Sequence, residues 1–478
     1  MRRICLTLPT NRPCTATIAA VAEEAAYAAR HFDTEVHLLI LDSCAAPDFE
    51  KHAEAVRRIA PDPRIVVHHL DEAHQSDFLR RVIDRAGAVK PDLLLDLMLP
   101  AAVSYGACTN RAFLLAAALG CESVHRRDSD SRYQVVDGER VFPVHHELLA
   151  LGRPAADAAP HVTETALAAE RMSREVALVG GSFVGELSVD IGEILRIDPE
   201  VYHDMVGLWA PVHWSGEQKR QLVDESFRGA GTDPFTEDHS TLTVVDPMRV
   251  DMCNIAFHGV HERVPLPPAT DTIGSDYFLI HLVHDAGLPG VLHNRNIVNY
   301  YTGERRTESG FPAYQLRFVK FLLSMLYFNF IYEHMALAGA SLLDEQGRVR
   351  ASAVARLARE SAGLDRSETS TGWTSSTPPT ADWAAATPTS PTCCVSGAHA
   401  SWTKRAATSR TSPCWWRPGS RWSGRPRSPP WTRRPGSGRD GARDAGVRTA
   451  ARRAGGDDRG PYRPRPDRDR GPLRHAEA

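Results

Sequence analysis

The fold is decided by residues 2–42, RRICLTLPTNRPCTATIAAVAEEAAYAARHFDTEVHLLILD. Residues 4–8 are an apolar run that stops at Pro9, and residues 36–41 are a second run that stops at Asp42. Both runs predict buried strands, because short apolar segments bounded by polar or turn residues are typical of a sheet interior. The alanine-rich residues 15–31 between them predict a helix. This strand, helix, strand order predicts an α/β fold in which helices cover a mostly parallel sheet.

The same alternation continues to residue 130. The predicted helices are 47–59, 75–86 and 110–119, and the predicted strands are 64–70 and 123–126. Gly120 stands where a left-handed residue would end the last of these helices. Residues 92–99 fit a strand and a helix equally well. The first part of the chain is therefore predicted to be a Rossmann-type mixed sheet flanked by helices.

Three later segments extend this organisation. Residues 176–185 are apolar and predict a tight glycine turn, because Gly180-Gly181-Ser182 lacks the lysine of a phosphate-binding loop. Residues 251–258 predict a strand. Residues 314–338 are strongly apolar, but Arg317, Lys320 and Asn329 interrupt them, which favours a buried helix over a membrane span.

Composition narrows the class of protein. The chain has 478 residues with a net charge of −3, and its nine cysteines include no C-x-x-C pair. Together with a start too short for a secretory signal, this predicts a cytoplasmic protein with reduced thiols, no zinc site and no membrane contact.

The composition changes near residue 367. Seven of the nine tryptophans follow that point, and residues 401–478 hold 20 basic against 7 acidic residues, so the first 400 residues are acidic. Too few apolar residues remain there to form a core, which predicts a disordered tail. Arg, Pro, Ser and Trp together favour an out-of-frame translation of GC-rich DNA. The alternative is a genuine basic tail that binds RNA, DNA or acidic partners; without such a tail we expect no nucleic-acid partner.

The chemistry is expected at Asp128-Ser129-Asp130, which follows the predicted strand 123–126. Two carboxylates separated by one residue can hold a hard divalent cation, and that cation can neutralise a diphosphate leaving group. Taken alone, a D-x-D tripeptide is most often a solvated turn, so its position after a strand is what favours a site.

Four other segments accompany it. They are Pro9-Thr10-Asn11-Arg12, Asp42-Ser43, Tyr105-Gly106-Ala107-Cys108-Thr109-Asn110-Arg111-Ala112 and Gly274-Ser275-Asp276-Tyr277-Phe278. With the D-x-D, these segments resemble the GT-A class of glycosyltransferases, the fold of the family-2-like enzymes that use nucleotide sugars. The third segment is similar to the A-x-N-x-G helix start of that class. The fourth is similar to its late G-x-E-D segment, which carries the catalytic base.

The resemblance implies a role for each place. Asp276 would be the catalytic base, and Mg²⁺ or Mn²⁺ would be held by Asp128, Asp130 and His293. The nucleotide-sugar donor would be bound by Thr10, Asn11, Arg12, Asp42, Asn110, Arg111 and Arg295.

The residues leave plainer interpretations open. Ser275 stands where the class has Glu, and His281 and His284 lie where its arginine is expected. Asp276 would then only stabilise a helix start, and His293 would belong to a polar surface loop. Asn110 would likewise cap a helix beside an exposed Arg111. Arg126 and Arg127 would form a surface ion pair with the D-x-D carboxylates.

The predicted organisation is a donor-binding half at 1–135, an acceptor-binding half at 136–310, a helical segment at 311–366 and the tail at 367–478. The predicted function is metal-dependent transfer of a sugar from a nucleotide diphosphate to a small polar acceptor. The Ala- and Arg-rich, GC-biased composition indicates an actinobacterial source, where enzymes of the resembled class often glycosylate antibiotic precursors. An aminocyclitol precursor is therefore one candidate acceptor, with dihydrostreptosyl-type transfer as an example. The alternatives are a sugar-phosphate nucleotidyltransferase and a non-catalytic nucleotide-binding relative.

Overall fold

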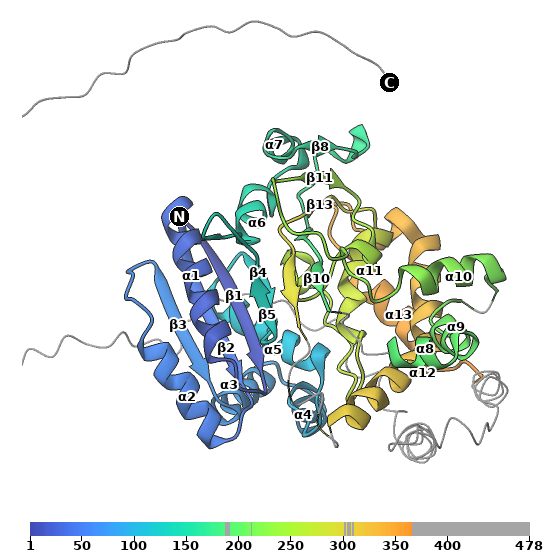
Figure 1. Cartoon of the computed structure of the whole chain (residues 1–478), viewed down its shortest axis with the longest axis horizontal. Helices are drawn as coiled ribbons and strands as arrows, with labels where there is room; N and C mark the ends of the chain where they lie inside the picture. Colours follow the sequence, from blue (N-terminus) through green and yellow to red (C-terminus); the bar gives the residue numbers. More distant parts are fainter. Residues whose placement is uncertain (187–191, 212, 301–302, 304–306, 308–309, 366–478) are drawn as a thin grey trace, which may run out of the picture. The chain divides into compact units, whose positions relative to one another are not determined.

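A nine-stranded mixed β-sheet runs through the chain in the order β3-β2-β1-β4-β12-β9-β13-β11-β8 (Figure 1). The computed structural model describes residues 1–186, 192–211, 213–300, 303, 307 and 310–365. The strands of this sheet are β1 (Arg2–Thr10), β2 (Thr34–Asp42), β3 (Ile65–Leu70), β4 (Ser123–Arg127), β8 (Glu164–Thr165), β9 (Leu178–Gly180), β11 (Ser240–Thr243), β12 (Asn254–His258) and β13 (Gly290–His293). The predicted mixed sheet is confirmed.

Beyond β4 the sheet becomes mixed, with antiparallel pairs at β4–β12, β12–β9 and β13–β11 and parallel pairs at β9–β13 and β11–β8. The neighbours β3, β2, β1 and β4 are all parallel, whereas β12 is antiparallel to both β4 and β9. The register pairs Asn254, at the start of β12, with Arg127, at the end of β4. The loop that follows β4 and the loop that precedes β12 therefore leave the sheet at the same edge.

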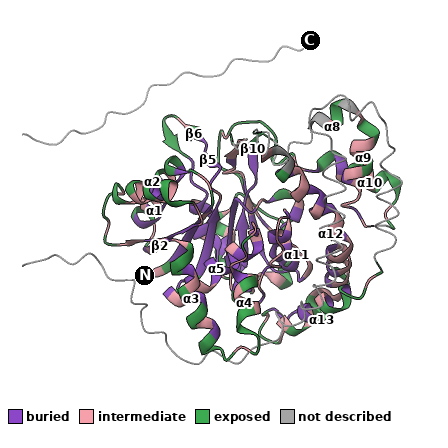
Figure 2. Ribbon diagram, turned by 90° about the horizontal axis from the view of Figure 1, so that it is seen from below, coloured by how far each residue is buried: buried purple, intermediate pink, exposed green. Residues whose placement is uncertain are grey.

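Helices cover both faces of the sheet (Figure 2). In that view α1 and α2 lie on one face, and α3, α4 and α5 lie on the other. The helices are α1 (Thr15–His31), α2 (Ala46–Arg57), α3 (Glu72–Arg85), α4 (Pro91–Met98), α5 (Tyr105–Leu119), α6 (Val144–Ala150), α7 (Ala155–Ala158), α8 (Gly192–Ile197), α9 (Pro199–Gly207), α10 (Gly216–Glu225), α11 (Phe278–Asp285), α12 (Gly310–Ala338) and α13 (Ala351–Ser361). The core between α1 and the sheet is built from Ile18, Val21 and Ala25 against the inner faces of β1 and β2.

The starts of helices α4 and α5 are explained by residues in or next to their first turns. The ambiguous residues 92–99 form the helix α4, which has Pro91 in its first turn and Asp92 beside it, both favourable at a helix start. Helix α5 begins at Tyr105, five residues earlier than predicted, because the Ser104 side chain accepts a hydrogen bond from the backbone of Ala107. Gly120 ends it in the left-handed conformation, as predicted.

Gly106 explains why a small residue stands in the first turn of α5. A Cβ atom at this position would lie 2.1 Å from the carbonyl oxygen of Pro267. The loop at residues 266–267 therefore packs directly on the backbone of α5, which holds that helix start in place.

Two smaller sheets complete the fold. One has the order β10-β14-β5, with β5 (Ser131–Tyr133), β10 (Phe183–Gly185) and β14 (Ile297–Asn299), and the other pairs β6 (Val135–Val136) with β7 (Glu139–Arg140). Strand β5 follows the D-x-D turn at once, so this second sheet continues from the edge at which β4 ends.

The predicted helical segment is present as α12 and α13. By length and composition, Ala313–Leu342 could cross a membrane, and it is the one helix in the described ranges that meets this criterion. Its buried side chains include Phe318, Leu322 and Met335, and it packs against α11 and α13. The absence of a membrane partner stays a prediction.

The division into a donor half and an acceptor half also stays a prediction, although strands from residues 2–127 and 164–293 share one sheet. The predicted tail, 367–478, lies outside the described residues.

Candidate active site

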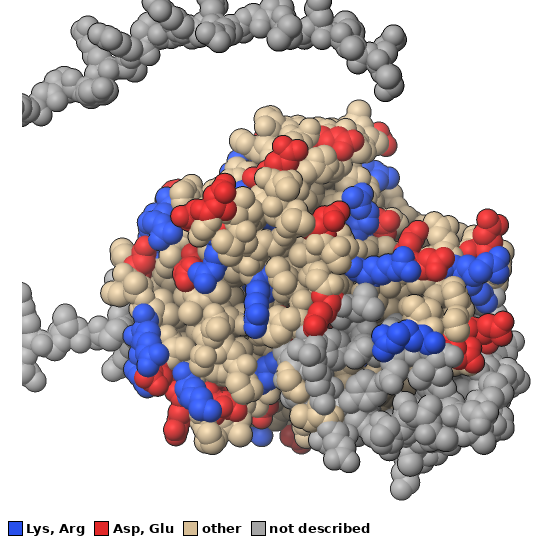
Figure 3. Space-filling view, in the orientation of Figure 1, with Lys and Arg blue, Asp and Glu red and all other residues tan. Residues whose placement is uncertain are grey.

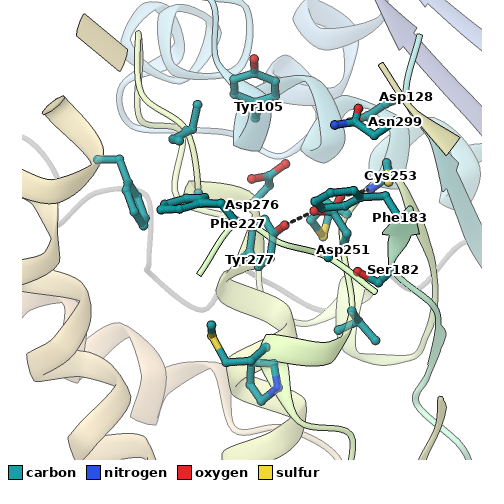
Figure 4. A pocket seen from close by; sticks show the side chains of 18 of the residues that line it. Tyr105, Asp128, Ser182, Phe183, Phe227, Asp251, Cys253, Asp276, Tyr277 and Asn299 are labelled. Atoms are coloured by element: carbon teal, nitrogen blue, oxygen red, sulfur yellow. Dashed lines mark hydrogen bonds between the residues drawn. The ribbon is translucent and has the colours of Figure 1, made fainter. Parts of the chain in front are cut away.

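A pocket of about 170 Å³ lies at the edge of the sheet where β4 ends and β12 begins (Figure 4). Among the described residues that line it are five carboxylic acids and neither lysine nor arginine. The acids are Asp128, Asp130, Glu225, Asp251 and Asp276. A pocket lined in this way attracts cations and repels a free diphosphate, so it suits an anionic ligand only when a cation binds with it.

Arg126 lies behind this pocket and joins two of its acids. Its Nη1 donates to Oδ2 of Asp276 at 2.7 Å, and its Nη2 lies 3.0 Å from Oδ1 of Asp128. The Arg126 side chain is only 2% exposed. The predicted surface ion pair is thus a buried one, and it fixes the catalytic candidate Asp276 beside the D-x-D turn.

The loop after β1 reaches the second acid of the D-x-D. Arg12 Nη1 donates to Oδ2 of Asp130 at 3.0 Å, and the Thr10 hydroxyl donates to the backbone carbonyl of Arg12 at 2.9 Å. Asn11 is exposed in the same loop. In α1, the Thr17 hydroxyl donates to the carbonyl of Ser129. The structure therefore brings the predicted donor loop next to the predicted metal ligands.

Asp128 has an unusual electrostatic environment. Burial, together with the charges of Asp130, Asp276 and Asp251, raises the pKa of its carboxyl to about 6, although the charge of Arg126 opposes this rise. A divalent cation would relieve this repulsion among carboxylates. Carboxylate oxygens are the donors that Mg²⁺ and Mn²⁺ prefer, so the residues present fit the predicted metal ion.

Asp276 occupies the short 3₁₀ turn η5 (Ser275–Tyr277), directly before α11. It begins a helical segment, as predicted, but its hydrogen bond goes to Arg126 rather than to a backbone amide of that helix. The structure therefore shows a contact that helix capping alone would not require.

Asp251 and Tyr277 were not expected from the sequence. Asp251 precedes β12, and Tyr277 donates its hydroxyl hydrogen to Asp251 Oδ2, as the dashed line in Figure 4 shows. Burial raises the pKa of Tyr277 well above its ordinary value, which keeps the hydroxyl protonated. The acid at residue 251 has no motif around it, and only the pairing of β12 with β4 could have placed it at the site.

Asp42 lies apart from the pocket, in a network of histidines. Its Oδ2 accepts hydrogen bonds from His52 Nδ1 at 2.7 Å and from His69 Nε2 at 2.8 Å. Burial opposes the ionised carboxyl, but these hydrogen bonds and the backbone amide of Cys44 hold the pKa of Asp42 below its usual range. Asp42 is not among the described residues that line the acidic pocket, where the donor was expected to bind.

The side chains of Asp42, Cys44 and His52 also lie close enough together to hold a metal ion, with their ligand atoms within 4.8 Å of one another. Both ring nitrogens of His52 are already used, because Nε2 accepts the backbone amide of Cys14 at 2.9 Å while Nδ1 donates to Asp42. Burial also raises the pKa of the Cys44 thiol. These contacts describe a hydrogen-bond network rather than a ligand set.

Asn110 and Arg111 lie beside the pocket without lining it. The Asn110 amide pairs with both the carbonyl and the backbone amide of Leu266. Arg111 donates to Gln75 Oε1 at 2.7 Å and to the Met98 carbonyl at 2.6 Å. In the structure these two residues anchor α5 to the segments around it.

His293 and Arg295 lie on and after β13, and neither is among the described residues that line the pocket. His293 is buried and stacks on His146, with ring centroids 5.5 Å apart, and burial lowers its pKa. Arg295 forms two hydrogen bonds with Asp238, at 2.6 and 2.7 Å. Among the predicted site residues, the structure therefore groups Arg12, Asp128, Asp130 and Asp276, and it places His293 and Arg295 elsewhere.

Buried ion pairs and hydrogen bonds hold β4, the strand that precedes the D-x-D turn, against its neighbouring helices. Arg127 donates to both oxygens of Glu24, at 3.0 and 2.8 Å, and to Oε2 of Glu147 at 2.9 Å. His125 Nδ1 lies 2.7 Å from the same Glu147 oxygen. All four side chains are fully buried. This network attaches the strand that carries the D-x-D turn to α1 and α6.

The ionisation of Glu147 should make the free energy of unfolding depend on pH in the acid range. Burial raises its pKa, but the charge of Arg127 and hydrogen bonds from His125 and Arg127 outweigh this and hold the pKa at about 2. Because the folded pKa lies below the unfolded value, the stabilisation is complete above about pH 4.5 and is lost as the pH falls toward 2. The difference in unfolding free energy between the wild type and Glu147→Gln should therefore shrink over this range in urea titrations. A difference that stays constant with pH would contradict this assignment.

Comparison with known proteins gives a family. The sequence profile described as "Family of unknown function (DUF6271)" matches residues 2–374. No curated protein matches. Among solved structures, the chain aligns with the mannosyltransferase PcManGT from Pyrobaculum calidifontis in complex with GDP-Man and Mn²⁺, at 12% identity and a TM-score of 0.33, over 87% of this chain and 85% of that one. A TM-score this low carries no functional assignment. The family match covers most of the sequence, and the chain belongs to the family of unknown function DUF6271.

Proposed function

We propose that the protein is a metal-dependent glycosyltransferase that moves a sugar from a nucleoside diphosphate donor to a small acceptor. The observation that carries this proposal is the pocket in which Asp128, Asp130, Asp251 and Asp276 converge with neither lysine nor arginine in the described lining. The grouping of Asp276 with the D-x-D turn by Arg126 supports it further.

The proposed roles follow from the contacts. Asp128 and Asp130 would hold the divalent cation, which when bound would offset the negative charge that grows on the leaving diphosphate. Arg12, paired with Asp130, would orient that carboxylate and lie near the donor. Arg126 holds Asp276 through Oδ2, and Oδ1 would act as the base toward the acceptor.

The reaction is a single displacement. Asp276 takes the proton of the acceptor hydroxyl as that oxygen forms a bond to the anomeric carbon of the sugar. The bond between the anomeric carbon and the diphosphate oxygen breaks, and the nucleoside diphosphate leaves with the electron pair. This route inverts the configuration of the sugar.

Surface charge agrees with a small-molecule substrate. On the face in Figure 3, the basic and acidic side chains of the described residues are interspersed rather than gathered into one basic surface. A nucleic-acid-binding face is instead recognised by clustered Lys and Arg.

Incubation of the full chain and Mn²⁺ with a panel of nucleotide sugars and small hydroxylated acceptors, and in parallel with nucleoside triphosphates and sugar phosphates, followed by mass spectrometry, tests the proposal. We expect nucleoside diphosphate to be released in the presence of Mn²⁺ and not in the presence of EDTA. Pyrophosphate release from a nucleoside triphosphate and a sugar phosphate would instead identify a nucleotidyltransferase. Binding of a nucleotide sugar with no product would identify a non-catalytic relative.

A further inference from the structure

The pocket has a second wall that is aromatic. Trp209 lies 5.2 Å from Phe227 and 5.3 Å from Phe321 between ring centroids, and all three line the pocket. Trp209 follows α9, Phe227 follows α10, and Phe321 lies in α12. Segments far apart in the sequence therefore build one continuous ring surface.

This aromatic wall, Trp209, Phe227 and Phe321, lies against the element that carries Asp276. Gly274 precedes η5 with φ +77°, and a Cβ atom there would lie 2.5 Å from the Phe321 ring. Phe227, Asp276 and Tyr277 all line the same pocket (Figure 4). A substrate that rests on the aromatic wall therefore lies in the pocket that also holds the proposed base.

The backbone of Phe227 has a strained conformation that the surrounding packing must hold in place. Its φ is 63°, in the left-handed region that large side chains rarely adopt. Such strain persists where neighbouring packing holds a residue in place, and it gathers at functional sites. Here the strained residue is one of the three rings of the wall.

The three rings of the wall present apolar faces, on which the flat, apolar part of a ligand can stack. The hydrogen-bond partners for a hydroxyl group are other residues of the same lining, among them Asp276. The aromatic wall offers ring faces, and Met248, Met252 and Met325 add thioethers beside it. These groups favour flat apolar bodies.

We propose that the acceptor is a hydroxylated aromatic compound, whose ring lies on Trp209, Phe227 and Phe321 while its hydroxyl group meets Asp276. This inference rests on the proposed glycosyl transfer and names its acceptor class. It is an alternative to the small polar acceptor predicted from the sequence. The carboxylate end of the pocket serves the donor, and the aromatic wall serves the acceptor.

Isothermal titration of the full chain with 2-naphthol tests the acceptor class, with myo-inositol as the polyhydroxylated probe. Separate titrations with UDP and GDP in Mn²⁺ test the donor site. Trp209→Ala should weaken 2-naphthol binding by on the order of tenfold, because a ring contact is lost. The matched control is Trp214→Ala, which removes a tryptophan outside the described lining. Phe227→Gly is a second variant that removes a ring and relaxes the left-handed backbone, so it should weaken 2-naphthol binding in a protein that still folds.

The two proposals fail separately. Binding of 2-naphthol that Trp209→Ala and Phe227→Gly weaken, with nucleotide binding kept, supports the aromatic acceptor. Binding of nucleotide and myo-inositol without 2-naphthol would overturn the acceptor class and leave glycosyl transfer standing. Binding of 2-naphthol without any nucleotide would support the aromatic subsite and overturn glycosyl transfer. If neither 2-naphthol nor nucleotide binds, both proposals are wrong.

Discussion

Asp276→Asn should lower kcat for sugar transfer by roughly 10²- to 10⁴-fold, the range for loss of a general base. Asparagine keeps the size of the side chain and can still accept the hydrogen bond from Arg126, but it cannot take a proton from the acceptor. Donor binding should change little, because the proposed cation is held by Asp128 and Asp130. Initial rates measured over a range of donor concentrations separate the two effects.

Asp271→Asn is the matched control. Asp271 lies five residues before Asp276 and pairs with Lys320 outside the described pocket lining. Its φ of 51° is a conformation that asparagine tolerates. The kcat of Asp271→Asn should match that of the wild type. An Asp276→Asn protein that retains wild-type kcat would remove Asp276 from the mechanism.

Arg127→Met should lower the free energy of unfolding by about 3–5 kcal/mol relative to the wild type. This is the usual cost of removing one partner from a buried ion pair. The replacement leaves Glu24 and Glu147 buried without their shared cation. Methionine fills much of the same space, so the lost charge rather than a cavity accounts for the effect. Urea unfolding followed by circular dichroism measures it.

Arg140→Met provides the comparison on the surface. Arg140 pairs with Glu23, the neighbour of Glu24 on α1, but that pair is exposed. An exposed pair contributes about 0–1 kcal/mol, so this variant should unfold close to the wild type. Equal and small losses in both variants would show that the buried network does not support β4.

Local patterns were enough to predict most elements of the sheet. Apolar runs with polar ends gave β1 and β2, and the alanine-rich stretch between them gave α1, because such signals depend on neighbouring residues alone. Residues 92–99 could not be assigned by hydrophobicity, since a short apolar run fits either element. The helix start at Pro91 and Asp92 was the usable signal.

The site was only partly predictable for a different reason. The D-x-D turn can be recognised because both acids lie in one loop. Asp251 meets Asp128 only through the antiparallel register of β12 on β4, and no local pattern encodes that register. Asp42 was predicted to lie at the site, but the structure places it in another network. It ends a strand as expected, but His52 and His69, brought to it by later elements, bind its carboxylate.

The most direct test of metal-dependent donor binding is a calorimetric titration of the full chain with UDP and GDP, with and without Mn²⁺. We expect binding in Mn²⁺ that is absent in EDTA and is lost in Asp130→Ala. The control Asp233→Ala removes an exposed acid outside the described lining and should bind as the wild type does. Nucleotide binding that is equal with and without Mn²⁺, or that survives in Asp130→Ala, would contradict the proposed role of the acidic pocket.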